Sequence, residues 1–182
     1  MSTIELDAFL ADSVASVQGK VYALGAGWSR ISVAQFPARH DRVGIGLLFR
    51  LPAGSANEPR RFELRMHGPA DEELALGAGP EGPVNRIAGE FTAGGSEEQI
   101  VPIGLNLNGL ALPGPGDYQV VISMQGRDVK SLGFAVQALV ALWLFQRFDL
   151  SLAAAAVFFF WAGLLTAGSY PVAAWLAGRI GL

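Results

Sequence analysis

Charge is distributed very unevenly along this chain. Residues 134–182 contain only three charged side chains, whereas the 133 residues before them contain 26. Charged side chains are almost never buried without a partner, so a segment with so few of them suits a protein interior or lipid. The sequence therefore predicts two parts. A β-sandwich domain over residues 1–137 is followed by a C-terminal membrane anchor over residues 138–182.

The longest uncharged run of this anchor covers residues 150–168. As a helix rising about 1.5 Å per residue it would measure roughly 28 Å, close to the roughly 30 Å hydrocarbon core of a bilayer. Its many Ala and Leu residues favour a helix. We expect one spanning helix there and an interfacial or re-entrant tail over 171–182. The side chains expected to contact lipid are Leu150, Phe158, Phe159, Phe160, Trp161, Leu164, Leu165 and Trp175.

Two alternatives to a membrane anchor are compatible with this apolar tail. A buried helix of a soluble protein would have a similar composition, and so would a translated stretch without a selected function. The beginning of the chain, MSTIELDAFLADS, has acidic residues where a signal peptide is basic, and it has no apolar core. We therefore expect the N-terminal domain on the cytoplasmic side of the membrane.

Composition and motifs give no support to a catalytic or cofactor site. The chain has no cysteine, which excludes disulfides and thiolate metal sites, and its net charge of −3 does not favour nucleic-acid binding. Gly25-Ala26-Gly27-Trp28 lacks the third glycine of a dinucleotide fingerprint. The only histidines, His40 and His67, are expected in solvated loops. We expect no catalytic residue, no bound cofactor and no metal.

Alternation of apolar and polar residues is the clearest pattern in residues 1–137. The segment from Arg61 to Met66 alternates at every position, which is typical of an antiparallel strand with one face on a core. Four further runs have apolar residues at every second position. The apolar positions of the five runs are Phe62, Leu64 and Met66; Val43, Ile45, Leu47, Phe49 and Leu51; Val101, Ile103, Leu105 and Leu107; Tyr118, Val120, Ile122 and Met124; and Leu132, Phe134 and Val136.

Turn-forming residues separate these runs. Gln18-Gly19-Lys20 and Gln125-Gly126-Arg127-Asp128 have the spacing of tight hairpins, and segments 51–59 and 77–83 are rich in Gly and Pro, as loops are. Seven or eight short strands with such turns predict a mainly β fold. We expect an antiparallel β-sandwich, immunoglobulin-like or related, followed by a C-terminal transmembrane α-helix.

Several short motifs lie within one stretch near the N-terminus and at the end of the predicted sandwich. They are Asp12, Gln18-Gly19-Lys20, Leu24-Gly25-Ala26-Gly27-Trp28 and Leu132-Gly133-Phe134-Ala135-Val136. This set resembles a family of small bacterial β-sandwich proteins with no assigned function, over about residues 5–137. The resemblance implies a fold and no activity, and the apolar tail departs from that family of soluble chains. For a bacterial chain, the expected location is the inner membrane, crossed once.

Four arginines form a candidate basic face: Arg60, Arg61 and Arg65, with Arg50 in the adjacent predicted strand. Of these, Arg50, Arg61 and Arg65 are the candidate interface residues. On one face they would hold the domain against anionic lipid, and the alternative is cross-strand pairing with acids such as Glu63. We expect a membrane-anchored, non-catalytic interaction module, an accessory subunit whose partners are the lipid bilayer and membrane proteins. The alternatives are a small ligand-binding or enzymatic sandwich that uses loop residues, and a soluble sandwich that oligomerises through its tail.

Overall fold

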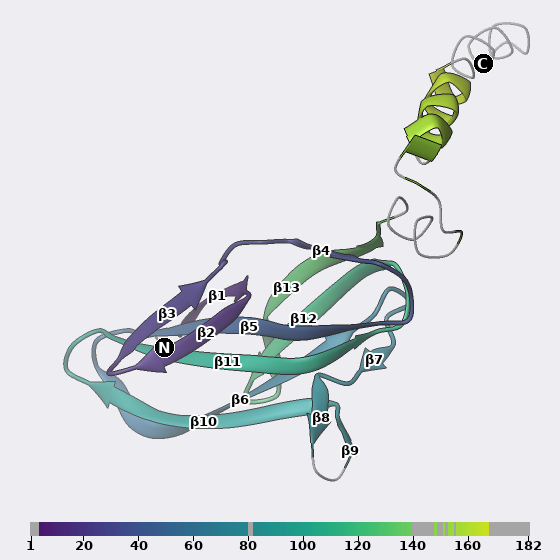
Figure 1. Cartoon of the computed structure of the whole chain (residues 1–182). Helices are drawn as coiled ribbons and strands as arrows, with labels where there is room; N and C mark the ends of the chain where they lie inside the picture. The colour runs from purple at the N-terminus through teal and green to yellow at the C-terminus, as the bar shows by residue number, and fades with distance from the viewer. Residues whose placement is uncertain are drawn as a thin grey trace, which may run out of the picture. The chain divides into compact units, whose positions relative to one another are not determined.

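Thirteen strands make up the described part of the first of two units in this chain. The computed structural model describes residues 4–79, 82–139, 148, 151, 153–154 and 156–167. It divides the chain into Met1–Ala138 and Leu139–Leu182 (Figure 1). The strands are β1 Glu5–Ala11, β2 Ser13–Val17, β3 Lys20–Leu24, β4 Arg30–Val33, β5 Ala38–Leu51, β6 Ser55–His67, β7 Glu73–Leu74, β8 Gly77–Gly79, β9 Gly82–Val84, β10 Arg86–Gly95, β11 Gln99–Leu112, β12 Gly116–Met124 and β13 Arg127–Ala138.

Two sheets packed face to face form the body of the first unit (Figure 1). The first sheet has three strands in the order β1-β5-β11. The second has the order β10-β6-β12-β13-β4, with β7 paired to β6. All pairs are antiparallel except β13 with β4, which is parallel. Two separate hairpins, β2-β3 and β8-β9, complete the unit.

Side-chain alternation explains why these strands pack as a sandwich. The predicted inward residues of β5, β6 and β12 are buried, and so are Leu107, Phe134 and Val136. Those of β11 before Leu107, and Leu132, are partly buried and pack against the same core. The ring of Phe49 in the first sheet lies 4.7 Å from that of Phe91 in the second, centroid to centroid. The prediction of a mainly β, antiparallel fold is confirmed.

Both predicted hairpins have tight two-residue turns. Gln18 and Gly19 have φ values of 50° and 72°, and Gln125 and Gly126 have 49° and 77°. Two consecutive positive φ values define a turn whose twist matches that of the flanking strands. Glycine at the second position takes this conformation without strain.

The end of β11 and the start of β12 are joined by a hydrogen bond across the connecting turn. The buried Tyr118 hydroxyl donates to the carbonyl oxygen of Gly114, at 2.6 Å. The Tyr118 ring also stacks on Phe134, with centroids 5.5 Å apart. Burial raises the pKa of the Tyr118 hydroxyl, so it remains a neutral donor. This side chain therefore fixes the corner between two strands of opposite sheets.

Several sequence-based assignments differ from the structure. The loop predicted over 51–59 is shorter in the structure, because β6 already begins at Ser55. The loop predicted over 77–83 contains β8 and the start of β9. Strands β1 and β10 were not predicted. In β10 the inward position is occupied by Gly89, which has no side chain. The ring of Phe62 on the neighbouring strand lies where a Cβ of residue 89 would be. A missing inward side chain removes the alternation by which a strand is recognised.

The second unit contains a helix over residues 156–167, with residues 148, 153 and 154 also helical. Ser151 caps it, because its hydroxyl accepts a hydrogen bond from the backbone N–H of Ala154. Twelve residues rise only about 18 Å. Among the described residues, no helix has both the length and the apolar composition needed to cross a bilayer. The predicted span over 150–168 is thus supported only as this shorter helix. Leu150, Trp175 and the tail 171–182 lie outside the described residues.

Candidate functional site

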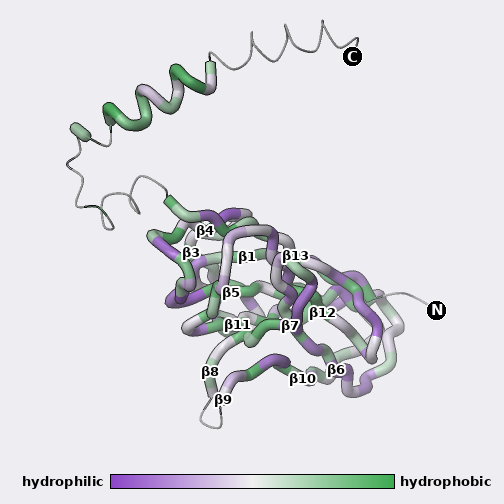
Figure 2. Tube along the Cα trace, turned by 90° about the vertical axis from the view of Figure 1, so that its right-hand side faces the viewer, coloured by the Kyte–Doolittle hydropathy of each residue, from purple (hydrophilic) through white to green (hydrophobic). Residues whose placement is uncertain are grey.

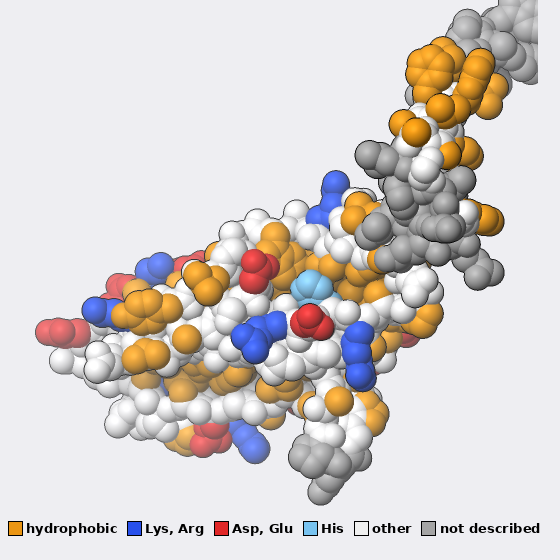
Figure 3. Space-filling model, in the orientation of Figure 1, with side chains coloured by type: hydrophobic (Ala, Val, Ile, Leu, Met, Phe, Trp, Pro, Cys, Tyr) orange, Lys and Arg blue, Asp and Glu red, His pale blue; other side chains and the backbone are white. Residues whose placement is uncertain are grey.

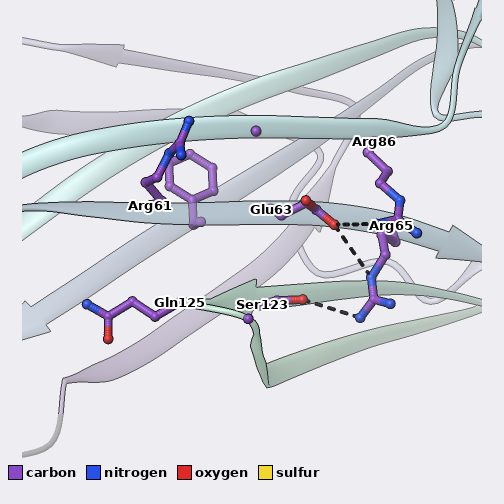
Figure 4. Close-up of a pocket in the computed structure, with 9 residues that line it drawn as sticks. Arg61, Glu63, Arg65, Arg86, Ser123 and Gln125 are labelled. Atoms are coloured by element: carbon purple, nitrogen blue, oxygen red, sulfur yellow. Dashed lines mark hydrogen bonds and ion pairs between the residues drawn. The ribbon is translucent and has the colours of Figure 1, made fainter.

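A groove of about 520 Å³ lies on the second sheet, on the face turned away from the core. Its walls come from neighbouring strands, because the residues that alternate with the core residues of β6, β10 and β12 all point outward. Figure 4 shows the residues that line it, and its polar side chains are labelled. They are Arg61, Glu63, Arg65, Arg86, Ser123 and Gln125.

Arg65 binds two neighbouring polar side chains at this groove. Its Nη2 donates to Asp128 Oδ1 at 2.6 Å and to Ser123 Oγ at 3.3 Å, and the Ser123 hydroxyl donates to the same carboxylate oxygen at 2.8 Å. The hydrogen bond from Ser123 lowers the pKa of Asp128, and the Arg65 guanidinium lowers it further. The Nε of Arg65 is buried without a hydrogen bond, 3.9 Å from Glu63 Oε1.

Arg86 stands directly opposite Arg65 in the β10–β6 register, so two like charges face each other. Two carboxylates compensate. Arg86 binds Glu73 with both Nε and Nη2, at 3.1 and 3.2 Å, and its Nη1 reaches Glu63 at 3.4 Å. The hydrogen bond from Arg86 lowers the pKa of Glu73, while the same contact raises the pKa of Arg86. The three acids Glu63, Glu73 and Asp128 thus balance the cations of the groove.

The arrangement is chemically suited to recognition of a polar surface. Arg61 is the most solvent-accessible of its cations, with 81% of its side chain exposed and a single ion pair, to Glu90 at 3.5 Å. Among the described residues, no group of three or more His, Asp or Glu side chains is placed to hold a metal ion.

The three predicted interface arginines do not all lie on this face. Arg61 and Arg65 lie together on β6. Arg50 lies on β5 in the other sheet, where its Nε binds Asp7 Oδ2 at 2.9 Å, a contact that raises the pKa of Arg50. Consecutive strands in the sequence were expected to be neighbours, but β5 and β6 belong to different sheets.

Arg60, expected on the basic face, is buried instead, although its neighbour Arg61 is exposed. Its guanidinium donates to the backbone carbonyl oxygens of Ala56, Glu58 and Ala93. The sequence contains a signal for this burial. Arg60 lies two residues before the inward residue Phe62, and side chains two residues apart in a strand point to the same face.

The two histidines are separated. His40 lies within β5, beside a groove of about 460 Å³ that also involves Asp12, Arg39 and Arg42. His67 ends β6, in the second sheet, with its Nδ1 3.0 Å from Asp71. Both lie in strands rather than in the loops predicted for them. Trp28 packs on Phe134 edge to face, with centroids 5.8 Å apart, as a core anchor.

The helix of the second unit presents a different kind of surface. Seven large apolar side chains on it are between 40% and 74% exposed, and Figure 2 shows the helix as mainly hydrophobic. They include all the predicted lipid-facing residues that the structure describes there. These seven are Val157, Phe158, Phe159, Phe160, Trp161, Leu164 and Leu165.

Sequence reasoning missed Ser123 and Arg86, which line the groove, and Asp128 and Glu73, which bind its arginines. They come from four different strands, and their convergence depends on register between segments far apart in the chain. Of these four residues, only Ser123 lies on a strand that the sequence had already predicted, where its position in the alternation indicates an outward side chain.

Comparison with solved structures gives distant similarities. One is an immunoglobulin-like protein from Pseudomonas aeruginosa, at 9% identity, TM-score 0.38, and coverage of 75% of this chain and 98% of that one. Another is the alkylpurine DNA glycosylase AlkC of Pseudomonas fluorescens bound to DNA with an abasic site analog, at 10% identity, TM-score 0.39, and coverage of 74% and 30%. A third is a beta-glucosidase from Listeria innocua, at 11% identity, TM-score 0.39, and coverage of 74% and 16%. The chain thus spans less than a third of these two enzymes.

Family membership comes from the sequence. No curated protein matches this chain. One family model does match, over residues 6–137, which is more than half of the chain and almost the whole sandwich. That range agrees with the resemblance to a family of β-sandwich proteins without an assigned function, which is thereby confirmed. The chain belongs to a family of unknown function (DUF6941).

Proposed function

We propose that this protein is a membrane-attached, non-catalytic interaction module, in which a β-sandwich is held at a bilayer by the C-terminal segment. The observation that carries the proposal is the apolar, exposed helix over 156–167. The five consecutive residues 157–161 are all large and apolar, and they extend over more than one full turn. No side of that turn is polar. A helix that is hydrophobic all round is found inside a protein core or in lipid.

Lipid is the better match for this helix than a protein core. Aromatic side chains such as Phe158 and Trp161 suit the boundary region of a bilayer, and the uncharged sequence 150–168 is long enough for deeper insertion. A charge within such a segment opposes insertion by about 2.5–3.5 kcal/mol at the centre of the bilayer. This large penalty makes the proposal easy to test with one substitution.

The sandwich supports a recognition role. The hydrogen bond from the Tyr118 hydroxyl to the Gly114 carbonyl oxygen is like the tyrosine corner of immunoglobulin-type sandwiches. Together with the strand order of the two sheets, it leads us to infer an immunoglobulin-like topology. The outer groove offers Arg61 as its most accessible cation, with a single exposed ion pair to Glu90. A partner that docks there would do so through polar contacts at a membrane surface. Membrane proteins are therefore the expected partners, and co-purification in mild detergent would identify them.

The test is flotation of the full chain with vesicles. The variant Phe160→Asp places a charge in the apolar helix, and Val129→Asp is its matched control, because Val129 is an exposed apolar residue on β13 of the sandwich. We expect wild type and Val129→Asp to float. Phe160→Asp should reduce the vesicle-binding constant by roughly 100-fold, as a penalty of about 3 kcal/mol implies.

Two results would contradict the proposal. If Phe160→Asp floats as well as wild type, the helix is not the attachment. If wild type stays in solution and Phe160→Asp lowers its molecular mass in light scattering, the tail is an oligomerisation surface. Protease treatment of inside-out and right-side-out vesicles from the host then tests the expected cytoplasmic side of the sandwich.

A further inference from the structure

The hairpin β2-β3 forms a third layer on the outer face of the first sheet (Figure 1). Polar contacts fix it there. The side chain of Asn106 on β11 binds the Val14 backbone twice, because its Nδ2 donates to the carbonyl oxygen at 2.7 Å and its Oδ1 accepts from the N–H at 3.0 Å. The Ser16 hydroxyl donates to the carbonyl oxygen of Pro102 at 2.8 Å. An amide that pairs with one residue in this way imitates a neighbouring strand.

Glycines in the sheet make room for this layer. A Cβ added to Gly44 would lie 2.8 Å from the Val14 side chain and 2.9 Å from the backbone of Ser13. At Gly104 it would lie 2.9 Å from Val14 and 3.1 Å from the backbone of Ala15. Val14 itself is buried. The hairpin is thus a rigid part of the sandwich whose inner face is already occupied.

The other face of the hairpin is apolar and exposed. Register places Leu24 opposite Ser13, Tyr22 opposite Ala15 and Lys20 opposite Val17, and these pairs alternate with the buried Val14. Leu24 is 73% exposed, Tyr22 57% and Val17 51%. Figure 3 shows hydrophobic side chains gathered over this region. Three large apolar residues therefore project from one face, on which Lys20 is the only charged residue.

We propose that this outward face of the hairpin β2-β3 is a second membrane contact, which dips into the headgroup region of an anionic bilayer. It rests on the proposed function, because the tail must first bring the sandwich to the membrane. Leucine and valine would enter the acyl boundary, tyrosine suits the interface with its ring in lipid and its hydroxyl in water, and Lys20 would pair with lipid phosphates.

The size of the patch favours lipid over a second copy of the chain. Three side chains exposed by half to three-quarters present on the order of a few hundred Å², well below the roughly 800 Å² per partner of a standard protein interface. A lipid contact needs no such minimum when a tether supplies a high effective concentration.

The path of the chain links the hairpin to the end of the sandwich through one short strand. After β3 the chain continues through residues 25–29 into β4. Strand β4 pairs with the last residues of β13, with Val33 opposite Ala138. The hairpin is therefore connected through residues 25–29 to the strand that pairs with the last residues of the sandwich.

A site-specific probe can test this on the full chain, because the chain has no cysteine of its own. Leu24→Cys carries an environment-sensitive fluorophore, and Ser131→Cys, exposed on β13 in the other sheet, is the matched control. Both proteins are mixed with vesicles of phosphatidylserine and phosphatidylcholine, or of phosphatidylcholine alone. We expect a blue shift at residue 24 and none at residue 131, and the lipid concentration for half-maximal shift should rise about tenfold without the anionic lipid or with Lys20→Glu.

Flotation measured on the same samples separates the two proposals. Chains that float while the probe at residue 24 stays in water overturn the hairpin contact and leave the tail attachment intact. Chains that do not float, with no response at residue 24, refute both. A blue shift that grows with protein concentration in the absence of vesicles assigns the face to a second copy of the chain and also overturns the lipid contact.

Discussion

Two neighbouring arginines on β6 should differ strongly in how much their substitution changes stability. Arg60 is 4% exposed, and its guanidinium donates to the carbonyl oxygens of Ala56, Glu58 and Ala93. Arg61 is 81% exposed at its side chain and has one ion pair, at 3.5 Å. The two residues are adjacent in the sequence and have the same side chain. A difference in stability between their variants therefore reports the effect of burying the guanidinium.

The expected magnitude follows from the contacts. Arg60→Met keeps much of the buried stem but leaves three carbonyl groups without their donor, and each such loss is worth about 1–1.5 kcal/mol. We expect a decrease of about 3–5 kcal/mol in the free energy of unfolding, a large share of the roughly 5–15 kcal/mol of a typical domain. Arg61→Met breaks one exposed pair and should change the same quantity by less than about 1 kcal/mol.

Urea unfolding of the full chain, followed by tryptophan fluorescence, measures both values. Thermal unfolding should give the same order, with the midpoint of Arg60→Met lower by on the order of 10 °C. Urea midpoints of Arg60→Met and Arg61→Met that differ by less than the equivalent of about 1 kcal/mol would refute a stabilising role for the buried guanidinium. A greater stability of Arg60→Met than of Arg61→Met would refute it as well.

Two further predictions concern single hydrogen bonds and pH. Tyr118→Phe removes the donor to the Gly114 carbonyl and should lower the unfolding free energy by about 1–2 kcal/mol; an unchanged urea midpoint would show that the bond is unimportant. The pKa of Asp128 lies below its ordinary value of 3.8, chiefly through Ser123, and the pKa of Glu73 lies below 4.5, chiefly through Arg86. Their stabilising effect is complete above those values and is lost as the pH falls through the lower folded ones. Urea midpoints between about pH 5 and pH 2 should therefore decline less steeply in Asp128→Asn than in wild type, and equal slopes would contradict this.

Sequence patterns predicted the strands in which every inward position carries a large apolar residue. Residues 62, 64 and 66 of β6 illustrate this, since charged residues stand between them and such alternation suits a strand with one buried face. The alternation of inward and outward side chains fails where the backbone conformation of one residue shifts it by one position. In β11, Leu107 points inward and so do Leu110 and Leu112, because Gly109 with φ 67° shifts the alternation by one residue. A period of two cannot anticipate such a shift without knowledge of the partner strand.

The groove on the second sheet was only half predictable for a similar reason. Arg61 and Arg65 were recognised as outward residues of one strand. Their partners depend on which strands become neighbours, and Arg50 was assigned to the same face because β5 precedes β6 in the sequence. Long-range packing decides which strands share a sheet, and the contact of Phe49 with Phe62 and Phe91 is an example. A short window of sequence does not contain this information.

The hairpin β2-β3 joins the family pattern to the proposed membrane contact. The Asp12, Gln18-Gly19-Lys20 and Leu24 to Trp28 motifs that carry the resemblance all lie on this hairpin or at its base. Asp12 fills the space that a Cβ on Gly25 would need, and its N–H donates to the Leu24 carbonyl at 2.9 Å. These motifs determine the turn and the base of the hairpin, but not the side chains on its outward face. In water that face would favour polar residues, and Tyr22 and Leu24 contribute nothing to the core. A contact with lipid would bury these apolar side chains, which is what the lipid proposal supplies.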